Sequence, residues 1–296
     1  MKPEDIRIPS HGEQLAAYLY RPDSGGDHAP CVVMAHGFSA TRDDGLPAYA
    51  EAFRDADFAV LLFDYRHFGA SSGEPRQLLD ISRQQDDYRA VLRWARQAGW
   101  IDPDRIVLWG SSFSGGHVLA VAASDPRIAA VISQAPYTDN LPTVRAMPVA
   151  NVLRASAAAL RDRLGAAMGR APRLIPAVGS PGTFAVMTAA DAKPGFEALV
   201  GPQSRWRNEV AARFVLPLAL YRPVRAAARL TMPVLVCVCD ADTTTPPASS
   251  IRATDDAPRG ELRRYPYGHF AIYHDPQVKA DQVEFLQRVV AASRQV

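Results

Sequence analysis

The stretch from Arg105 to His117, RIVLWGSSFSGGH, constrains most strongly what this chain can fold into. Its first half is apolar and β-branched and predicts a buried strand, and a helix-forming stretch follows it. The turn between them consists of glycine and serine, because bulky residues there would clash with the neighbouring strand and helix. A strand, a sharp turn and a helix in this order are typical of a nucleophile elbow, which would place Ser112 at its tip.

The turn departs from the usual Gly-x-Ser-x-Gly pattern, because Ser114 stands at the last position and the glycines follow one residue later. Serine is small enough for that position, but Ser111 and Ser114 then become rivals of Ser112 as nucleophile. Ser114 would fall in the first helical turn, where backbone amides attract hydroxyl groups without any chemistry. We expect Ser112 to be the nucleophile.

Two later strand ends add an acid and a base. A buried strand predicted over residues 232–239 is followed by the acidic loop DADTTTP, and a shorter strand at 261–266 is followed by Gly268-His269-Phe270. A serine hydroxyl is a poor nucleophile until an imidazole takes its proton and a carboxylate holds that imidazole in the right tautomer. The order Ser, Asp, His along the chain therefore predicts a catalytic triad.

The base and the acid each have alternatives. We expect His269 to be the base, with His274 as the second choice. We expect Asp242 to be the acid, while Asp240 and Asp139 remain open as alternatives.

These motifs resemble those of the α/β-hydrolase superfamily. The chain is most similar to its bacterial esterase-like members, and to the serine aminopeptidase and Xaa-Pro dipeptidyl-peptidase groups. The matching residues are His36-Gly37-Phe38, the run from Phe63 to Ser71, the run from Gly110 to Gly116, Asp242 with Pro246, and Gly268-His269-Phe270.

The resemblance implies roles for several further residues. The backbone amides of Phe38 and Phe113 would form the oxyanion hole, which holds the negative charge of the tetrahedral intermediate. His36 would order the oxyanion loop, and Asp64 would hold the Gly-rich loop that follows it. His117 is expected to be a buried, hydrogen-bonded residue behind the nucleophile.

Strands and helices alternate along most of the chain, which predicts an α/β fold: a mostly parallel, eight-stranded sheet flanked by helices. Residues 1–136 and 231–296 would form the core. Residues 137–230 break the alternation and would form an inserted, mainly helical cap, with helical runs at 149–168 and 205–220. Such a cap excludes water and shapes the pocket.

Aromatic residues of the predicted cap are candidates for the substrate pocket. They are Tyr137, Trp206 and Phe214, unless they simply pack the cap.

Composition limits the partners. The net charge of +2 gives no electrostatic case for nucleic acid or an anionic membrane, so we expect neither as a partner. The N-terminus has no apolar signal region, which favours a cytoplasmic protein. The three cysteines, Cys31, Cys237 and Cys239, fall in predicted strands and are expected to be structural thiols rather than metal ligands.

The sequence therefore predicts a serine hydrolase that cleaves a carboxylic ester, or a thioester or lactone, through an acyl-enzyme on Ser112, with no metal or organic cofactor. Its partner would be a small acyl substrate, and a homo-oligomer is left open. Peptidase or amidase activity is a weaker alternative, because the cap has no recognisable acidic cluster to anchor an amino terminus. A lyase or a ligand-binding protein on the same scaffold is a third.

Overall fold

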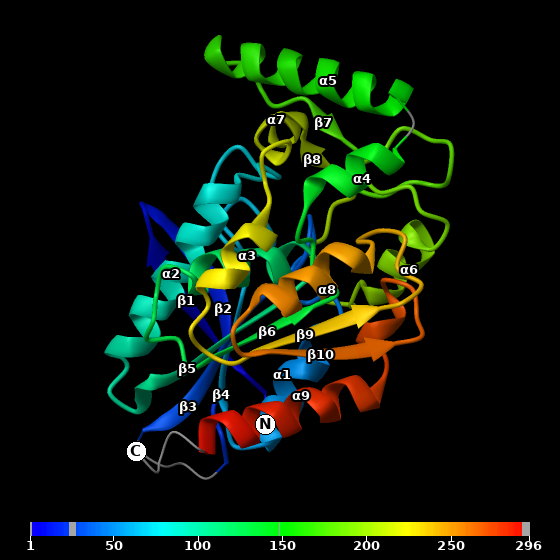
Figure 1. Cartoon of the computed structure of the whole chain (residues 1–296). Helices are drawn as coiled ribbons and strands as arrows, with labels where there is room; N and C mark the ends of the chain where they lie inside the picture. Colours follow the sequence, from blue (N-terminus) through cyan, green and yellow to red (C-terminus); the bar gives the residue numbers. More distant parts are fainter. Residues whose placement is uncertain (1, 24–27, 148, 292–296) are drawn as a thin grey trace.

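Short apolar runs assemble into one central sheet of eight strands in the computed structural model, which describes residues 2–23, 28–147 and 149–291 (Figure 1). The order of the strands is β1-β2-β4-β3-β5-β6-β9-β10, and β2 alone runs against the other seven. The prediction of a mostly parallel, eight-stranded sheet is thus confirmed. The strands are β1 (Glu4–Ser10), β2 (Glu13–Tyr20), β3 (Ala29–Ala35), β4 (Ala59–Phe63), β5 (Ile101–Ser111), β6 (Ala130–Gln134), β9 (Val234–Cys239) and β10 (Gly260–Tyr265).

Helices cover both faces of the sheet. The helices α1 (Pro47–Asp55) and α9 (Pro276–Ala291) pack on one face, and α2 (Ile81–Gln97), α3 (Phe113–Ala122) and α8 (Pro247–Asp256) pack on the other. Successive strand residues point to opposite faces, so that Val33 joins one apolar cluster and Val32 the other. A parallel sheet needs this arrangement, because its strands are apolar on both sides.

The predicted thiols lie in these buried layers. Cys31, Cys237 and Cys239 are free and buried within β3 and β9. Burial raises the pKa of Cys237 to about 12, so this thiol stays protonated at neutral pH.

The long connection between β6 and β9 contains all but one of the remaining helices and strands. They are α4 (Asn140–Ala146), α5 (Val149–Ala167), β7 (Leu174–Ile175), α6 (Ala192–Leu199), β8 (Val210–Ala211), η1 (Ala212–Phe214), α7 (Val215–Leu218) and η2 (Pro223–Arg229), with η3 (Ala271–Tyr273) later in the core. Figure 1 shows most of this segment above the sheet, with α6 near the arrowheads of β9 and β10.

The helix predicted at 205–220 is wrong over most of its length. Val210 and Ala211 form a strand paired with Leu174–Ile175, and only Val215–Leu218 is α-helical. Before the strand, the Asn208 side chain exchanges two hydrogen bonds with the backbone of Val178, at 2.8 and 3.0 Å. These long-range contacts hold the chain extended, and they outweigh a local preference for helix. The other predicted helical run matches α5.

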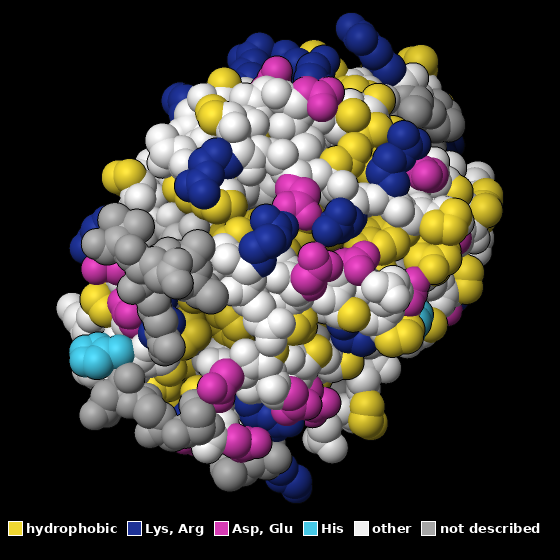
Figure 2. Space-filling view, turned by 60° about the horizontal axis from the view of Figure 1, so that its bottom comes forward, with side chains coloured by type: hydrophobic (Ala, Val, Ile, Leu, Met, Phe, Trp, Pro, Cys, Tyr) yellow, Lys and Arg dark blue, Asp and Glu magenta, His cyan; other side chains and the backbone are white. Residues whose placement is uncertain are grey.

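No helix in the described ranges combines the length and the apolar character that crossing a membrane requires. Basic and acidic side chains are interspersed over the face that Figure 2 shows.

Candidate active site

Ser112 stands at the point where β5 ends and α3 begins. Its φ of 57° and ψ of −117° are unusual for a residue with a side chain. The Ser112 amide donates to the carbonyl of Gln134 on the neighbouring strand, at 2.8 Å, which holds this backbone in place. The strained turn therefore has the geometry of a nucleophile elbow, and Ser112 is its tip.

Small residues make the turn sterically feasible. A Cβ on Gly110 would lie 2.3 Å from the Ser114 carbonyl oxygen, and one on Gly115 would lie 2.7 Å from the Pro136 ring. The second distance explains why glycine is needed at position 115, one residue after the last position of the usual pattern. Here Gly115 faces the next strand end, and the Ser114 side chain points elsewhere.

A hydrogen-bonded chain runs from Ser112 to two residues of other loops. The Oγ of Ser112 lies 3.0 Å from Nε2 of His269, and Nδ1 of His269 lies 2.6 Å from Oδ2 of Asp242. All three residues are buried. The loops after β5, β9 and β10 bring them together, because the carboxyl ends of parallel strands meet at one edge of the sheet.

The loop after β9 holds the Asp242 carboxylate in an ionised form. Burial by itself raises the pKa of Asp242, but the charge and hydrogen bond of His269 and the hydrogen bonds of Thr245 more than offset this and lower it. The amides of Thr244 and Thr245 donate to Oδ1 at 2.8 and 2.7 Å, and the Thr245 hydroxyl donates to Oδ2 at 2.8 Å. Asp242 can therefore orient His269 as a carboxylate.

The alternative acids are engaged elsewhere. Asp240 pairs with Arg264 at 2.9 Å on the surface. Asp139 caps α4 and accepts two hydrogen bonds from Arg222, at 3.0 and 2.8 Å. The structure brings neither to His269.

The alternative nucleophiles also have other partners, and the alternative base lies at the surface. Ser111 Oγ lies 2.6 Å from the Tyr273 hydroxyl, and the Gln134 amide donates to it. Ser114 bonds the His36 carbonyl and the Tyr65 hydroxyl. His274 is exposed and follows η3.

The loop after β3 passes close to Ser112. A Cβ on Gly37 would lie 3.0 Å from the Ser112 Cβ and 3.6 Å from its Oγ. His36 Nδ1 bonds the Gly37 carbonyl at 2.9 Å, while its Nε2 accepts from the Tyr65 amide at 3.5 Å. Burial lowers the pKa of His36 to about 4, so the ring is neutral at neutral pH and joins two loops through hydrogen bonds.

Asp64 and His117 have the hydrogen-bonded surroundings that the sequence predicts. Asp64 accepts from the amides of Arg42 and Ala70, at 2.7 and 2.8 Å, and so ties the Gly-rich loop to the sheet. His117 is fully buried behind the elbow, where its nitrogens bond Tyr221 at 2.6 Å and Gln84 at 3.0 Å.

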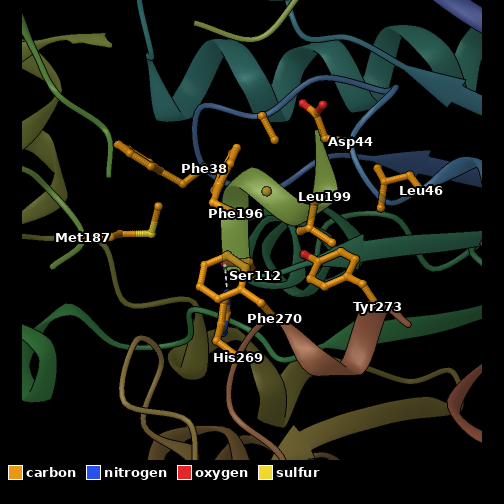
Figure 3. A pocket seen from close by; sticks show the side chains of 12 residues that line it. Phe38, Asp44, Leu46, Ser112, Met187, Phe196, Leu199, His269, Phe270 and Tyr273 are labelled. Atoms are coloured by element: carbon orange, nitrogen blue, oxygen red, sulfur yellow. Dashed lines mark hydrogen bonds between the residues drawn. The ribbon is translucent and has the colours of Figure 1, made fainter. Parts of the chain in front are cut away.

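A narrow cavity opens beside Ser112 and His269 (Figure 3). Figure 3 shows Phe38 and Met187 on one side of it and Leu46 and Tyr273 on the opposite side. The volume is about 20 Å³, which is room for about one water molecule. The cavity is lined by Gly37, Phe38, Ala40, Asp44, Leu46, Ser112, Met187, Phe196, Leu199, His269, Phe270 and Tyr273.

The three aromatic candidates for the pocket stand behind this lining. Phe214 packs on Phe38 with ring centres 5.1 Å apart, Tyr137 packs on Phe113 at 5.7 Å, and Trp206 stacks on Phe196 at 4.8 Å. None of the three lines the cavity itself. Phe214 and Trp206 support two residues that do, Phe38 and Phe196, whereas Phe113, the partner of Tyr137, is not part of the lining.

Sequence reasoning missed Met187, Phe196 and Leu199, which the inserted segment contributes to the cavity wall. No local signal identifies them, because a loop and a short helix reach the cavity only through their packing on the core. Thr245 had a weak signal, since it lies in a loop where an aspartate commonly accepts from the backbone amide two residues on, as Asp242 does from Thr244.

The fold and the elbow define the class, and comparisons with known proteins agree. Residues 11–150 match the family described as X-Pro dipeptidyl-peptidase (S15 family). The solved structure of the α/β hydrolase GrgF from Penicillium superposes with a TM-score of 0.86 at 24% identity, covering 98% of this chain and all of that one. The chain belongs to the α/β-hydrolase superfamily, as the resemblance implied.

Two further relatives have names that state an activity. The quorum-quenching protein AidA of Acinetobacter baumannii is 44% identical over 97% of this chain and 95% of its own length. The thiohydrolase aneE of Aspergillus aculeatus is 32% identical over 69% of this chain and 62% of its own length. The chain is thus an enzyme of the α/β-hydrolase class.

Proposed function

We propose that the protein hydrolyses a carboxylic ester, a thioester or a lactone through an acyl-enzyme on Ser112. The observation that carries this proposal is the buried, continuous hydrogen-bonded chain from Ser112 through His269 to Asp242. A serine hydroxyl with a hydrogen-bonded imidazole, itself oriented by a carboxylate, is the arrangement that activates serine for acyl transfer.

His269 carries a proton in both halves of the reaction. As Oγ of Ser112 bonds to the carbonyl carbon, its proton passes to Nε2 of His269. The tetrahedral oxyanion then collapses, the bond to the leaving oxygen or sulfur breaks, and His269 returns the proton to that atom. Water next attacks the acyl-enzyme and gives a proton to His269, which passes it to Oγ as the free acid departs.

The oxyanion would be held by backbone amides on two sides of Ser112. Phe113 begins α3, and the first amides of a helix have no partner within it. Phe38 follows Gly37, whose backbone approaches Ser112 closely. We assign the oxyanion hole to the amides of Phe38 and Phe113, which supports the same reaction class.

The cavity must be enlarged for a substrate to enter, because it has room for about one water. A second hollow of about 560 Å³ lies between α6 and the loops that carry Asp242 and His269. The two share Phe270 in their walls. Its ring lies 4.9 Å from that of His269 and packs so closely on α6 that a Cβ on Gly195 would lie 2.6 Å from it.

This second hollow would hold the leaving group. His269 must protonate the leaving atom, so the leaving group departs on the side of the His269 loop. The hollow is lined by residues on either side of Asp242 and His269, and by small apolar residues of α6, with Asp191 and His274 among its polar groups. A volume of this size accommodates a small-molecule group.

A peptidase is less well supported, since the cavity wall next to Ser112 is mainly apolar and contains one carboxylate, Asp44. That carboxylate already accepts hydrogen bonds from the amide and hydroxyl of Thr41, at 2.7 and 2.9 Å. An ester, thioester or lactone needs no such anchor.

The experiment that tests the proposal is intact-mass spectrometry after incubation with a small fluorophosphonate. The wild-type protein should gain the mass of one adduct, and Ser112→Ala should gain none. Ser114→Ala is the matched control and should label like the wild type.

Turnover is then measured on an ester, a thioester, a lactone and an anilide of the same acid. We expect the first three to be cleaved faster than the anilide. Labelling without any turnover of these substrates would argue for a lyase or a binding protein, and equal labelling of Ser112→Ala would contradict the assignment of the nucleophile.

A further inference from the structure

A row of apolar side chains on the outer helix α5 faces solvent. Val149, Leu153, Leu160 and Leu164 of α5, together with Met168 directly after it, are between 54% and 74% exposed. Leu220, just after α7, is 86% exposed, and α7 packs against α5. Figure 1 shows α5 at the edge of the molecule, with the rest of the inserted segment on one side only. Contiguous apolar surface of this kind marks an interaction site.

The row cannot be buried by a rotation of the helix, because its opposite side is anchored. The buried Asp162 of α5 accepts from Nε and Nη2 of Arg213 at 2.8 and 2.9 Å. It also accepts from the amides of Arg213 and Arg173, at 2.8 and 2.7 Å. Ala158 and Ala159 are buried on the same side. The exposed row is thus a fixed feature of this fold.

The intervals between the residues of the row are the same when they are counted from either end of the helix. When the exposed Ala157 is added to the row, its residues are separated by 4, 4, 3, 4 and 4 positions: Val149, Leu153, Ala157, Leu160, Leu164 and Met168. Two copies of α5 laid antiparallel would place Val149 opposite Met168, Leu153 opposite Leu164 and Ala157 opposite Leu160. An interface on a two-fold axis requires this self-complementarity, because each patch must fit its own copy.

We propose that α5 is the interface of a two-fold symmetric homodimer, in which the α5 helices of two copies pack antiparallel. The charged residues of the helix agree. Its exposed charged residues are Arg154, Arg161 and Arg163, and its one acid, Asp162, is buried. Arginine and methionine are enriched at protein interfaces, while lysine, glutamate and aspartate are depleted. The arginine stems can cover the edges of the apolar row.

The arginines also determine how the dimer responds to salt. At 100° per residue, Arg154 and Arg161 lie along one edge of the row and Arg163 along the other. Antiparallel pairing brings each edge against the same edge of the second copy, so that like charges approach. Salt screens this repulsion and should strengthen the dimer. An anionic lipid surface as the occupant would show the opposite dependence, since salt weakens its attraction for arginine.

Sedimentation velocity of the full chain tests the interface. The wild type should sediment as a dimer, with a dissociation constant that falls several-fold between about 0.05 and 0.5 M salt. Leu153→Glu/Leu164→Glu should be monomeric, and Ser82→Glu/Gln97→Glu, with the same added charge on the exposed side of α2, should remain dimeric. Fluorophosphonate labelling and the melting temperature show that each variant is folded, whatever the outcome for catalysis.

Cross-linking tests the antiparallel register. Oxidation of an equal mixture of Leu153→Cys and Leu164→Cys chains should give a disulfide-linked dimer. Either chain alone should not, because two copies of position 153 would lie roughly 16 Å apart along the axis. The native cysteines are buried and free.

Three results would overturn the proposal. They are a wild-type monomer at every salt concentration, a dimer that the Leu→Glu pair leaves intact, and efficient cross-linking of Leu153→Cys with itself. Binding of a monomer to phosphatidylserine-containing vesicles that salt abolishes would assign the row to a lipid surface instead.

Discussion

Gly37 and Ser112 come from different loops, yet a Cβ on Gly37 would lie 3.0 Å from the Ser112 Cβ. Only glycine lets the loop after β3 pass this close to Ser112 without a displacement. Gly37→Ala should therefore lower kcat for ester hydrolysis by roughly 3- to 10-fold, because the neighbouring groups must move by a few tenths of an ångström, and a full 1 Å shift of a reacting group costs about 100-fold. Gly99→Ala is the control, since a Cβ there meets nothing within 4 Å. Equal kcat values for the two variants would contradict this reasoning.

Asp242→Asn should lower kcat by about 10³- to 10⁴-fold with little change in KM. The amide would no longer stabilise the imidazolium of His269, and the loss of an orienting carboxylate has this magnitude in other serine hydrolases. Asp240→Asn, two residues away and paired with Arg264 on the surface, should stay within about two-fold of wild type. Steady-state kinetics on one ester measure both, and the reverse ranking would assign the acid to Asp240.

Ser114→Gly restores the usual glycine and separates structure from catalysis. The variant loses the bonds of Ser114 to the His36 carbonyl and the Tyr65 hydroxyl, which are both buried. We expect unfolding in urea to show a loss of about 1–3 kcal/mol, while fluorophosphonate still labels Ser112. A complete loss of labelling in a folded variant would show that Ser114 is needed for the chemistry.

Phe270→Ala should change the preference for the leaving group. Removal of the ring joins the cavity beside Ser112 to the hollow under α6. The ratio of kcat/KM for a bulky alcohol ester to that for the methyl ester of the same acid should rise at least about 10-fold. Phe53→Leu, in the core away from the cavity, should leave the ratio unchanged. A rise confined to esters of longer acids would place the acyl chain in the hollow instead.

Acid should destabilise the protein through its buried histidines. Burial lowers the pKa of His117 to about 3, whereas the unfolded chain titrates near 6.5. Between these values the unfolded state binds more protons than the folded state, so the free energy of unfolding falls as pH falls. The slope is about 1.4 kcal/mol per pH unit for such a histidine.

Urea unfolding between pH 5 and 6.5 checks this sign. His117→Gln should be less stable than wild type at pH 7, because its bonds to Tyr221 and Gln84 change, but its stability should depend less steeply on pH. His36, whose pKa is about 4 for the same reason, accounts for part of the slope that remains. Identical slopes in the two proteins would contradict a buried, neutral His117.

The sequence by itself determined the sheet, most helices and the order of the reactive loops. Apolar runs of strand length, the small residues around Ser112 and the histidine after β10 are local signals, because each follows from the needs of one strand or one turn. The chain order of Ser112, Asp242 and His269 was visible for the same reason.

The tertiary structure decided which of several candidates meet. Asp242 and Asp240 are two residues apart, but the turn after β9 directs only Asp242 inward to His269, while Asp240 faces Arg264. The wall of Met187, Phe196 and Leu199, and the strand at Val210 where a helix was predicted, depend on packing between segments far apart in the chain. Local patterns carry no record of such contacts, because their energy arises only when the two segments are brought together.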